Sequence, residues 1–353
     1  MRIAITGGTG FVGGHLARNL TSGGYQVVLC RRVPASPSKT LGASKKGSMS
    51  PIDTNSLGRM QAEQTLSWII GYAPLAVLPL GVAACRNVLR PWVFMWALCF
   101  AIFAGLKWLT WWKARGRVPH PAWRSVAYLL AWPGMDAEAF LSPSSPINEP
   151  TWRAWLSALF KTALGAALIW VVARHVPAQE SIVQGWVGML GLILLLHFGS
   201  FEVVALFWQR LGVDATPIMS SPLRSTSLGD FWGKRWNLGF RQFSHDLIFR
   251  PLQSRLGAGA AGFLVFVVSG LIHESVISFP ARGGYGLPTT YFVLQGLGVA
   301  VERSGFGKRL GLRQGRRGWL FTAAFTAGPV FLLFHHLFVL RVILPFMEAI
   351  GAQ

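Results

Sequence analysis

The residues best suited to chemistry in this sequence are a histidine and a glutamate that stand side by side in an apolar stretch. Residues 261–274 read AGFLVFVVSGLIHE and end in His273 and Glu274. Histidine exchanges protons near neutral pH, and an ionisable pair is costly to keep in hydrocarbon, so a functional site is the first hypothesis. The alternative is a histidine that only packs in a helical core. The small pair Ser269 and Gly270, which lets a helix or an acyl chain approach closely, favours function.

A second segment combines polar, basic and aromatic residues. Residues 221–238 read SPLRSTSLGDFWGKRWNL. We expect this amphipathic segment to lie at a membrane surface, with Phe231, Trp232 and Trp236 among the lipid headgroups. Such a segment is well placed to receive an anionic substrate that carries a coenzyme. The alternative is an aromatic anchor whose arginines only face lipid.

Other polar residues within apolar runs give weaker signals. His197 and Glu202 are five residues apart, so they diverge around a helix and form no standard metal pair. His335 and His336 are adjacent and cannot share one helix face. The three cysteines have no paired or metal-like spacing, so we expect neither a disulfide framework nor a metal site.

The composition places the chain in a membrane. Of 353 residues, 52% are hydrophobic and only 13% are charged, whereas soluble domains carry about a quarter charged residues. Most of the apolar runs reach the roughly 20 residues that a helix needs to cross about 30 Å of hydrocarbon. The sequence therefore predicts an all-α polytopic membrane protein with seven or eight transmembrane helices. The seven runs are 68–85, 91–112, 152–173, 185–208, 258–280, 287–302 and 319–345, and the weaker eighth is 123–133.

The basic residues predict the orientation of these helices. The net charge of +20 does not form one solvated face, because lysines and arginines alternate with the apolar runs, which argues against a nucleic-acid partner. If the N-terminus is cytoplasmic, most basic residues fall on that side, as the positive-inside rule requires. Attraction to anionic lipid headgroups then accounts for the charge. The cytoplasmic basic segments would be 31–59, 113–124, 210–255 and 303–317, leaving Arg86, Arg90, Arg174, Arg282 and, near the last helix end, Arg341 on the other side.

The N-terminus has a different pattern. Residues 2–13 read RIAITGGTGFVG, as expected of a strand, a glycine-rich turn and a helix start, and residues 25–30 suggest a second strand. Gly8, Gly10 and Gly13 fit the G-x-G-x-x-G pattern that brings a pyrophosphate to backbone amides. This start resembles the extended short-chain dehydrogenase and epimerase family.

That resemblance is incomplete. Residues 33–65 form a polar stretch with no third strand, and no tyrosine is followed four residues later by the lysine of the family's catalytic pair. We therefore expect an incomplete Rossmann-like βαβ fragment at 1–32, a linker at 33–65 and a membrane domain at 66–350. Arg31 and Arg32 would favour NADP over NAD, but NADP binding is not expected, because two strands cannot build a proper core.

The membrane domain resembles the wax synthase branch of the membrane-bound O-acyltransferase family. That branch has a D-F-W-x-x-R-W-N-like segment followed by an S-G-x-x-H-E helix, and both occur here in the same order and separation over roughly residues 66–350. The resemblance makes His273 the catalytic histidine and Asn237 its polar partner. Lys234 stands where many relatives have arginine, which keeps the charge. The surrounding motif positions, which the resemblance assigns to substrate binding, are Asp230, Trp232, Arg235 and Trp236.

The resemblance implies transfer of an acyl group from acyl-CoA to a long-chain alcohol, giving a wax ester. A neutral imidazole at His273 would take the hydroxyl proton, and Asn237 would hydrogen-bond the acyl donor. Glu274 points about 100° away from its neighbour on a helix and is expected to support the structure. Alternatives are a different lipid hydroxyl as acceptor, such as a sterol or glycerolipid, a non-catalytic scaffold or transporter, and a membrane-anchored oxidoreductase.

Overall fold

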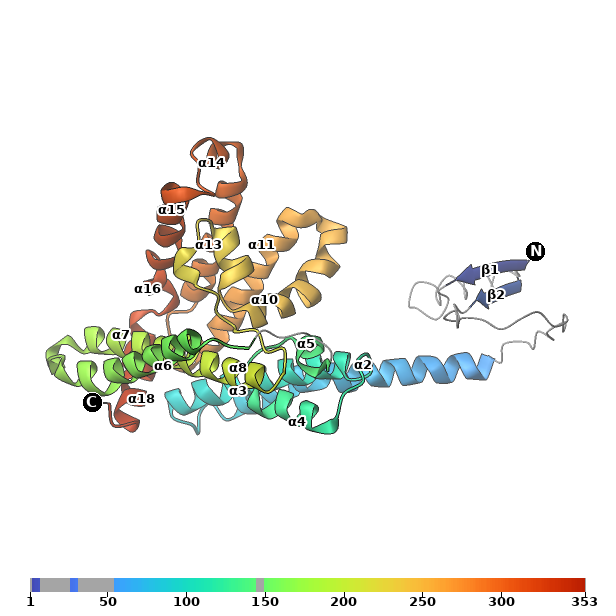
Figure 1. Cartoon of the computed structure of the whole chain (residues 1–353), viewed down its shortest axis with the longest axis horizontal. Helices are drawn as coiled ribbons and strands as arrows, with labels where there is room; N and C mark the ends of the chain where they lie inside the picture. The colour runs from blue at the N-terminus through green and yellow to red at the C-terminus, as the bar shows by residue number, and fades with distance from the viewer. Residues whose placement is uncertain (1, 7–25, 31–53, 144–148, 353) are drawn as a thin grey trace. The chain divides into compact units, whose positions relative to one another are not determined.

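The computed structural model describes residues 2–6, 26–30, 54–143 and 149–352, which are almost entirely helical (Figure 1). The chain divides into two compact units, residues 1–57 and 58–353. They are described separately here.

The first unit contains two short parallel strands. β1 (Arg2–Thr6) pairs with β2 (Gln26–Cys30), with Arg2 opposite Gln26 and Thr6 opposite Cys30. Both strands lie where the sequence predicts them. The turn with Gly8, Gly10 and Gly13, and the helix expected after it, lie outside the described residues. The complete βαβ fragment therefore stays a prediction.

The second unit is built from helices of very different length, several of them interrupted by π-helical turns. The first helix, α2, begins within the expected linker 33–65. The helices are α2 (Thr54–Ala84), α3 (Pro91–Ala114), α4 (Ala122–Ala131), α5 (Ala137–Leu141), α6 (Trp152–Ala167), α7 (Ser181–Leu192), α8 (Phe201–Arg210), α9 (Leu228–Asp230), α10 (Leu238–Ser244), α11 (Arg250–Val276), α12 (Ser278–Ala281), α13 (Leu287–Arg303), α14 (Gly305–Arg309), α15 (Gly315–Ala327), α16 (Val330–Leu333), α17 (His336–Phe338) and α18 (Leu344–Ala349). The π-helical segments are η1 (Leu168–Val172), η4 (Ile193–Ser200), η6 (Phe231–Arg235), η7 (His245–Phe249) and η8 (Val339–Ile343).

Among the described residues, five helical stretches are long and apolar enough to cross a membrane, so the chain is an integral membrane protein. A pair of helices bent by 57°, Gly315–Leu333 and His336–Ala349, can form a sixth span. The five are Ala62–Ala84, Pro91–Ala114, Trp152–His175, Ser181–Arg210 and Leu238–Ala281.

This count is lower than the seven or eight spans predicted. The weak run at 123–133 forms α4, which has only 10 residues and a length of about 15 Å. The run at 287–302 forms α13, whose 17 residues extend about 25 Å, less than the hydrocarbon thickness of about 30 Å. The other six runs coincide with the five spans and the bent pair.

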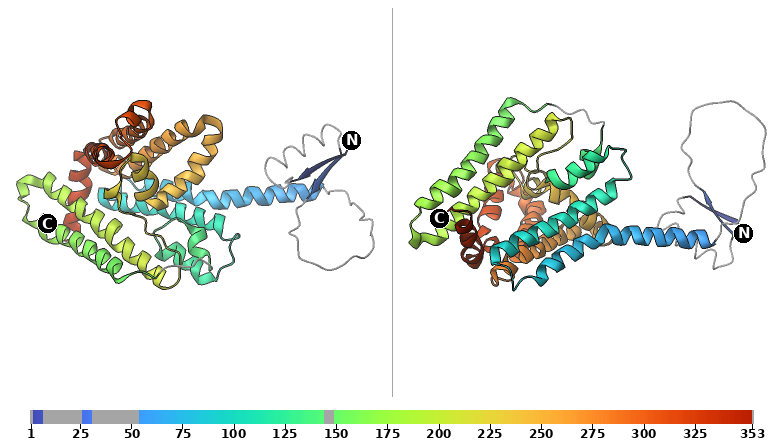
Figure 2. Two further views of the ribbon diagram at one scale, coloured as in Figure 1. Left: turned by 45° about the horizontal axis from the view of Figure 1, so that its top comes forward. Right: turned by 90° about the horizontal axis from the view of Figure 1, so that it is seen from below.

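Glycines allow two of the spans to pack backbone against backbone. A Cβ atom on Gly165 of α6 would lie 2.4 Å from the backbone nitrogen of Leu195, and one on Gly199 would lie 2.8 Å from Cα of Thr162. The α6 helix therefore lies directly along η4 and α8, as both views of Figure 2 show in green.

A second close pair joins α11, which carries the histidine, to α13. A Cβ atom on Gly270 would lie 2.8 Å from Cα of Thr289, and one on Gly296 would lie 2.8 Å from the ring of Phe263. Earlier residues of α11 thus face later residues of α13, so the two helices are antiparallel. Gly257, with φ 78° and ψ 164°, interrupts α11 before this paired part begins.

Candidate active site

His273 lies on α11 with one of its two ring nitrogens already engaged. Its Nδ1 lies 2.7 Å from the backbone oxygen of Ser269, one helical turn earlier. A carbonyl oxygen can only accept, so Nδ1 carries the proton and the neutral ring keeps its lone pair on Nε2. Nε2 has no hydrogen-bond partner in the described part of the chain. The local backbone therefore fixes the tautomer that a general base requires.

Residues 221–238, called the aromatic segment from here on, contact this histidine indirectly, through two successive ring contacts. The His273 ring lies 4.4 Å, between centroids, from Phe292 of α13, and Phe292 lies 5.7 Å from Trp232. Trp232 also packs 5.9 Å from Phe266 of α11 and donates from Nε1 to Oε1 of Gln295, at 3.2 Å. Trp232 thus inserts between α11 and α13, where its indole N–H has a partner, and its position among lipid headgroups stays a prediction.

A π-helical turn brings together two of the predicted substrate-binding residues. Within Asp230–Arg235, the Nε atom of Arg235 lies 2.5 Å from Oδ2 of Asp230, and both side chains are largely buried. These two charges therefore neutralise each other. Trp236 stacks on Phe231, with centroids 5.3 Å apart, and contacts Phe198 of η4 edge-on at 6.1 Å. The motif thus joins three helical elements: η4, α11 and α13. Contact of these residues with substrate stays a prediction.

Asn237 adopts a left-handed backbone conformation, with φ 43° and ψ 63°, which asparagine tolerates better than most residues. Its Oδ1 accepts a hydrogen bond of 3.2 Å from the backbone N–H of Phe240 and so caps α10. The amide Nδ2 makes no hydrogen bond within the described ranges. Asn237 is therefore oriented as a donor, although no hydrogen bond joins it to His273 among these residues.

Glu274 supports the neighbouring helix, as expected. Its Oε1 accepts from the backbone N–H of Gly286 at 2.7 Å, and its Oε2 accepts from the backbone N–H and hydroxyl of Thr289 at 3.3 and 3.0 Å. A carboxylate at the start of a helix satisfies amides that have no partner in the helix and complements the helix dipole. Glu274 therefore holds the N-terminus of α13.

Two buried residues that position the motif were not predicted from the sequence. Glu302, at the other end of α13, is 1% exposed and accepts from the backbone N–H groups of Leu228 and Gly229 at 2.7 and 3.0 Å. Gln295 is fully buried and links Trp232 to the carbonyl oxygen of Phe325. A polar residue in an apolar run is the only sequence signal that would have pointed to Gln295.

The weaker histidine candidates differ in their surroundings. His335 is buried, receives a hydrogen bond on Nδ1 from the backbone N–H of Phe338, and lies 3.3 Å from the hydroxyl of Ser278, so both ring nitrogens serve the structure. His197 lies in η4, and its Nδ1 is buried without a partner among the described residues. Glu202 pairs with Lys161 of α6. In the described part of the chain, no three metal-ligating side chains converge.

Comparison with known proteins connects this geometry to a family. Residues 215–294, which contain Asn237, His273 and the whole aromatic segment, match the family model of the membrane bound O-acyl transferase family. The resemblance seen in the two motifs is confirmed. Residues 3–84 match the NAD dependent epimerase/dehydratase family, which confirms the second resemblance and extends it beyond residue 32 into α2.

Individual relatives agree with the first match. "Probable long-chain-alcohol O-fatty-acyltransferase 9" of Arabidopsis thaliana is 37% identical over 213 residues, which is 55% of this chain and 61% of that protein. "Probable long-chain-alcohol O-fatty-acyltransferase 8" from the same plant is 29% identical over 59% of this chain and 63% of that protein. "Long-chain-alcohol O-fatty-acyltransferase" of Simmondsia chinensis is 35% identical over 26% of this chain and 29% of its own. The chain spans about three fifths of the length of the first two relatives.

Proposed function

We propose that this protein transfers an acyl group from acyl-CoA to a long-chain alcohol within the membrane, forming a wax ester. The observation that carries the proposal is the tautomer of His273, whose Nδ1 is engaged by Ser269 while Nε2 keeps its lone pair. The similarity to long-chain-alcohol acyltransferases supports the choice of substrates. Integral membrane helices suit a reaction between two lipophilic chains.

In the proposed reaction, Nε2 of His273 takes the proton of the alcohol as the alcohol oxygen attacks the thioester carbonyl. The new carbon–oxygen bond forms, and the carbon–sulfur bond breaks as the tetrahedral intermediate collapses. The proton then passes from the imidazolium to the departing CoA thiolate, so His273 returns to its starting state. The products are an ester and CoA.

The aromatic segment would serve the acyl donor. The Nδ2 of Asn237, which makes no hydrogen bond to any described residue, is suited to hydrogen-bond the thioester carbonyl as negative charge develops on its oxygen. Exposed cations suit the phosphates of CoA: Arg224 and Lys234 within the segment, and Arg241 just after it. Asp230 and Arg235, being paired with each other, would act by holding the segment in shape.

The direct test is ester formation in membranes that contain the full chain, labelled acyl-CoA and a panel of alcohols, sterols and diacylglycerol. His273→Ala is expected to reduce ester formation by about 10² to 10⁴-fold, because a general base contributes about that much. His175→Ala is a matched control, since His175 is exposed and makes the same type of bond to a backbone oxygen one turn earlier, that of Val171. Wild-type turnover by the His273→Ala protein would contradict the mechanism, and activity only on sterols or diacylglycerol would contradict the acceptor.

A further inference from the structure

The chain between α13 and α15 concentrates positive charge on one exposed turn. Residues 303–317 contain six lysines and arginines, whereas the nearest acidic residues in the sequence are Glu302 and Glu348. Glu302 is buried and bonded to backbone N–H groups, so the turn has no exposed carboxylate of its own. We call residues 303–317 the basic turn, and its cations, all exposed, are Arg303, Lys308, Arg309, Arg313, Arg316 and Arg317.

Glycines and a helix cap give the basic turn a fixed shape. Gly311 and Gly315 adopt φ 70° and 60°, a region that favours glycine, and they let the chain reverse between α14, at the top of Figure 1, and α15. Ser304 caps α14, and its Oγ accepts from the backbone N–H of Gly307 at 3.0 Å. Folded backbone therefore holds the six charges close together.

Contacts on both sides of the basic turn join it to the aromatic segment. Before the turn, Glu302 accepts from two amides of that segment. After the turn, a Cβ atom on Gly318 would meet the backbone oxygen of Thr226, and Nε1 of Trp319 donates to the backbone oxygen of Leu223 at 2.8 Å. A change in the turn therefore acts directly on the aromatic segment.

Exposed apolar side chains accompany these cations. Phe306 and Leu310 belong to the turn, and Phe306 is 65% exposed. Trp319 and Leu320 follow the turn and are also exposed, as is Leu223 of the aromatic segment. Single exposed apolar residues are common on protein surfaces, but several beside a cluster of cations are typical of a surface that lies on an anionic membrane.

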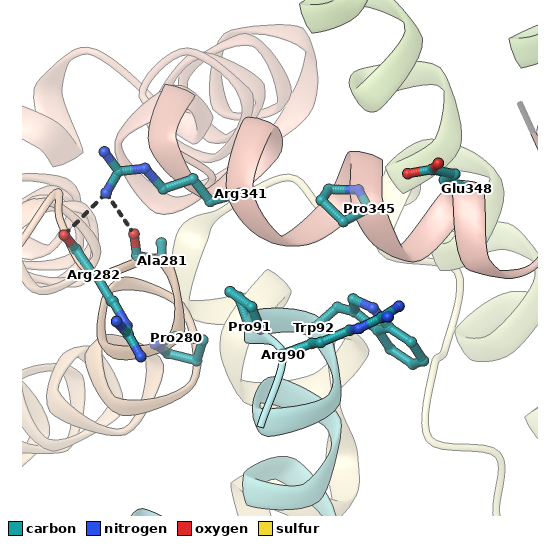
Figure 3. Close-up of a pocket in the computed structure, with 9 residues that line it drawn as sticks. All are labelled: Arg90, Pro91, Trp92, Pro280, Ala281, Arg282, Arg341, Pro345 and Glu348. Carbon is teal, nitrogen blue, oxygen red and sulfur yellow. Dashed lines mark hydrogen bonds between the residues drawn. The ribbon is translucent and has the colours of Figure 1, made fainter. Parts of the chain in front are cut away.

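Arginines near the other end of α13 are arranged differently. Figure 3 shows that the guanidinium groups of Arg90, Arg282 and Arg341 point in different directions around a pocket. Arg341 donates to the backbone oxygens of Ala281 and Arg282, and Arg282 donates to that of Arg86, so both arginines hold chain segments together. In the basic turn, by contrast, four cations make no side-chain hydrogen bond, ion pair or ring contact with a described residue: Lys308, Arg309, Arg316 and Arg317.

We propose that the basic turn binds the headgroups of anionic phospholipids at the membrane surface, and that this binding strengthens its contacts with the aromatic segment. Six like charges within residues 303–317 repel one another, and anionic headgroups reduce this repulsion without having to meet all the cations at one point. Less repulsion favours the folded turn and therefore the hydrogen bonds on either side of it. The exposed apolar side chains favour a bilayer surface over a water-soluble phosphate compound. This inference does not depend on acyl transfer.

The experiment uses the full chain in a neutral detergent and follows thermal unfolding by tryptophan fluorescence as phosphatidylglycerol is added. We expect the unfolding temperature to rise to a plateau, and about 0.5 M NaCl to weaken the rise, because salt screens interactions between exposed charges. Phosphatidylcholine is expected to cause a smaller rise. An equal rise with phosphatidylcholine, or a rise that salt leaves unchanged, would overturn the proposal.

Removing two cations locates the lipid. In a variant with Arg316→Gln and Arg317→Gln, we expect the half-saturating concentration of phosphatidylglycerol to rise about 30-fold, because each basic residue near anionic lipid contributes about 1 kcal/mol. The control carries Arg90→Gln and Arg255→Gln, which remove two exposed arginines without side-chain hydrogen bonds to described residues, and it should bind like the wild type. Equal behaviour of the two variants would place the lipid elsewhere. If the first variant does not fold, Lys308→Gln with Arg309→Gln provides the same test.

Hydrogen exchange at the amides of Leu228 and Gly229, which bond to Glu302, reports on the contact with the aromatic segment. Saturating phosphatidylglycerol should slow this exchange in the wild type, and unchanged exchange would overturn the coupling. CoA, whose phosphates are also anionic, serves as the competing ligand. If CoA without lipid reproduced both effects, and Arg316→Gln with Arg317→Gln abolished them, the basic turn would be a coenzyme site and the lipid proposal would be wrong.

Discussion

At the scale of single residues, the candidate site depends on carboxylates that bind backbone amides instead of cations. Glu274 and Glu302 each accept from two backbone N–H groups, one at either end of α13. Each carboxylate therefore holds a helix start in place while its negative charge is offset by peptide dipoles. This arrangement fixes α13 between the histidine helix and the aromatic segment.

Glu302→Gln tests the end of α13 nearest the motif. Glutamine keeps the shape but offers only one acceptor oxygen, so one of the N–H groups of Leu228 and Gly229 loses its partner. We expect a loss of about 1–3 kcal/mol in the free energy of unfolding, together with reduced ester formation. The measurement is thermal unfolding in detergent, with Glu180→Gln as control, because Glu180 is exposed and has no side-chain cap bond. Identical melting of the two variants would show that the buried carboxylate is not required.

The sequence predicted His273, Asn237 and the aromatic segment because each belongs to a short motif. It did not predict Glu302, whose partners lie 73 and 74 residues away and are backbone groups without a side-chain signature. It also did not predict the pairing of Asp230 with Arg235. In an α-helix, residues five apart do not face each other, and only the π-helical turn Phe231–Arg235 brings them together.

At the scale of helices, the site requires α11 and α13 to touch backbone to backbone. The apolar runs predicted both helices, but the sequence could not predict which helix fills the space beside Gly270, since many helices pack on small residues. The structure assigns that place to Thr289 and Phe292 of α13. Phe292 is also the ring that contacts His273, so helix spacing and site geometry are coupled.

Gly270→Ala is expected to separate the two helices. The added methyl group would lie 2.8 Å from Cα of Thr289, and backbone cannot move aside as a side chain can. Overpacking of this kind costs about 1–3 kcal/mol, and we expect ester formation to fall with it. Gly259→Ala on the same helix is the control, because among the described residues no heavy atom beyond its own helical turn lies within 4 Å of the added Cβ, and it should stabilise the helix by about 0.5–1 kcal/mol. Equal stability and activity of both variants would contradict the requirement for close contact.

At the scale of the whole molecule, the distribution of basic residues predicts that the N-terminus, residues 209–257 and the loop after α13 share the cytoplasmic side. Because α13 has only 17 residues, the side on which the loop after it lies decides whether α13 crosses the membrane. Cysteine labelling in intact cells compares two variants, one whose only cysteine is the exposed native Cys85 and one without native cysteines that carries Gln314→Cys. Cys85 should react from outside, and the position 314 variant only after permeabilisation. Labelling of both from outside would mean that α13 does not cross.

The N-terminal unit is expected to be dispensable for ester formation. Two strands of five residues bury too little apolar surface to offset the entropy of ordering them, so a dinucleotide site is not expected there despite the epimerase match. Deleting residues 1–53, which end just before α2, should leave ester formation unchanged. Loss of activity at equal expression, or saturable NADP binding that the deletion abolishes, would show that this unit has a working role.

The hydrogen bonds of Glu274 on α11 and Glu302 on α13 also imply an order of assembly during synthesis. The bonds of Glu274 close loops of 12 and 15 residues, so α11 and α13 can pair as soon as both have entered the membrane. Glu302 instead closes a loop of more than 70 residues, back to amides made much earlier. The first amides of the segment from Leu228 onward can therefore bond only to water or other groups until residue 302 leaves the ribosome. A chain that stops before Glu302 would contain every motif residue and still lack the fixed arrangement of its site.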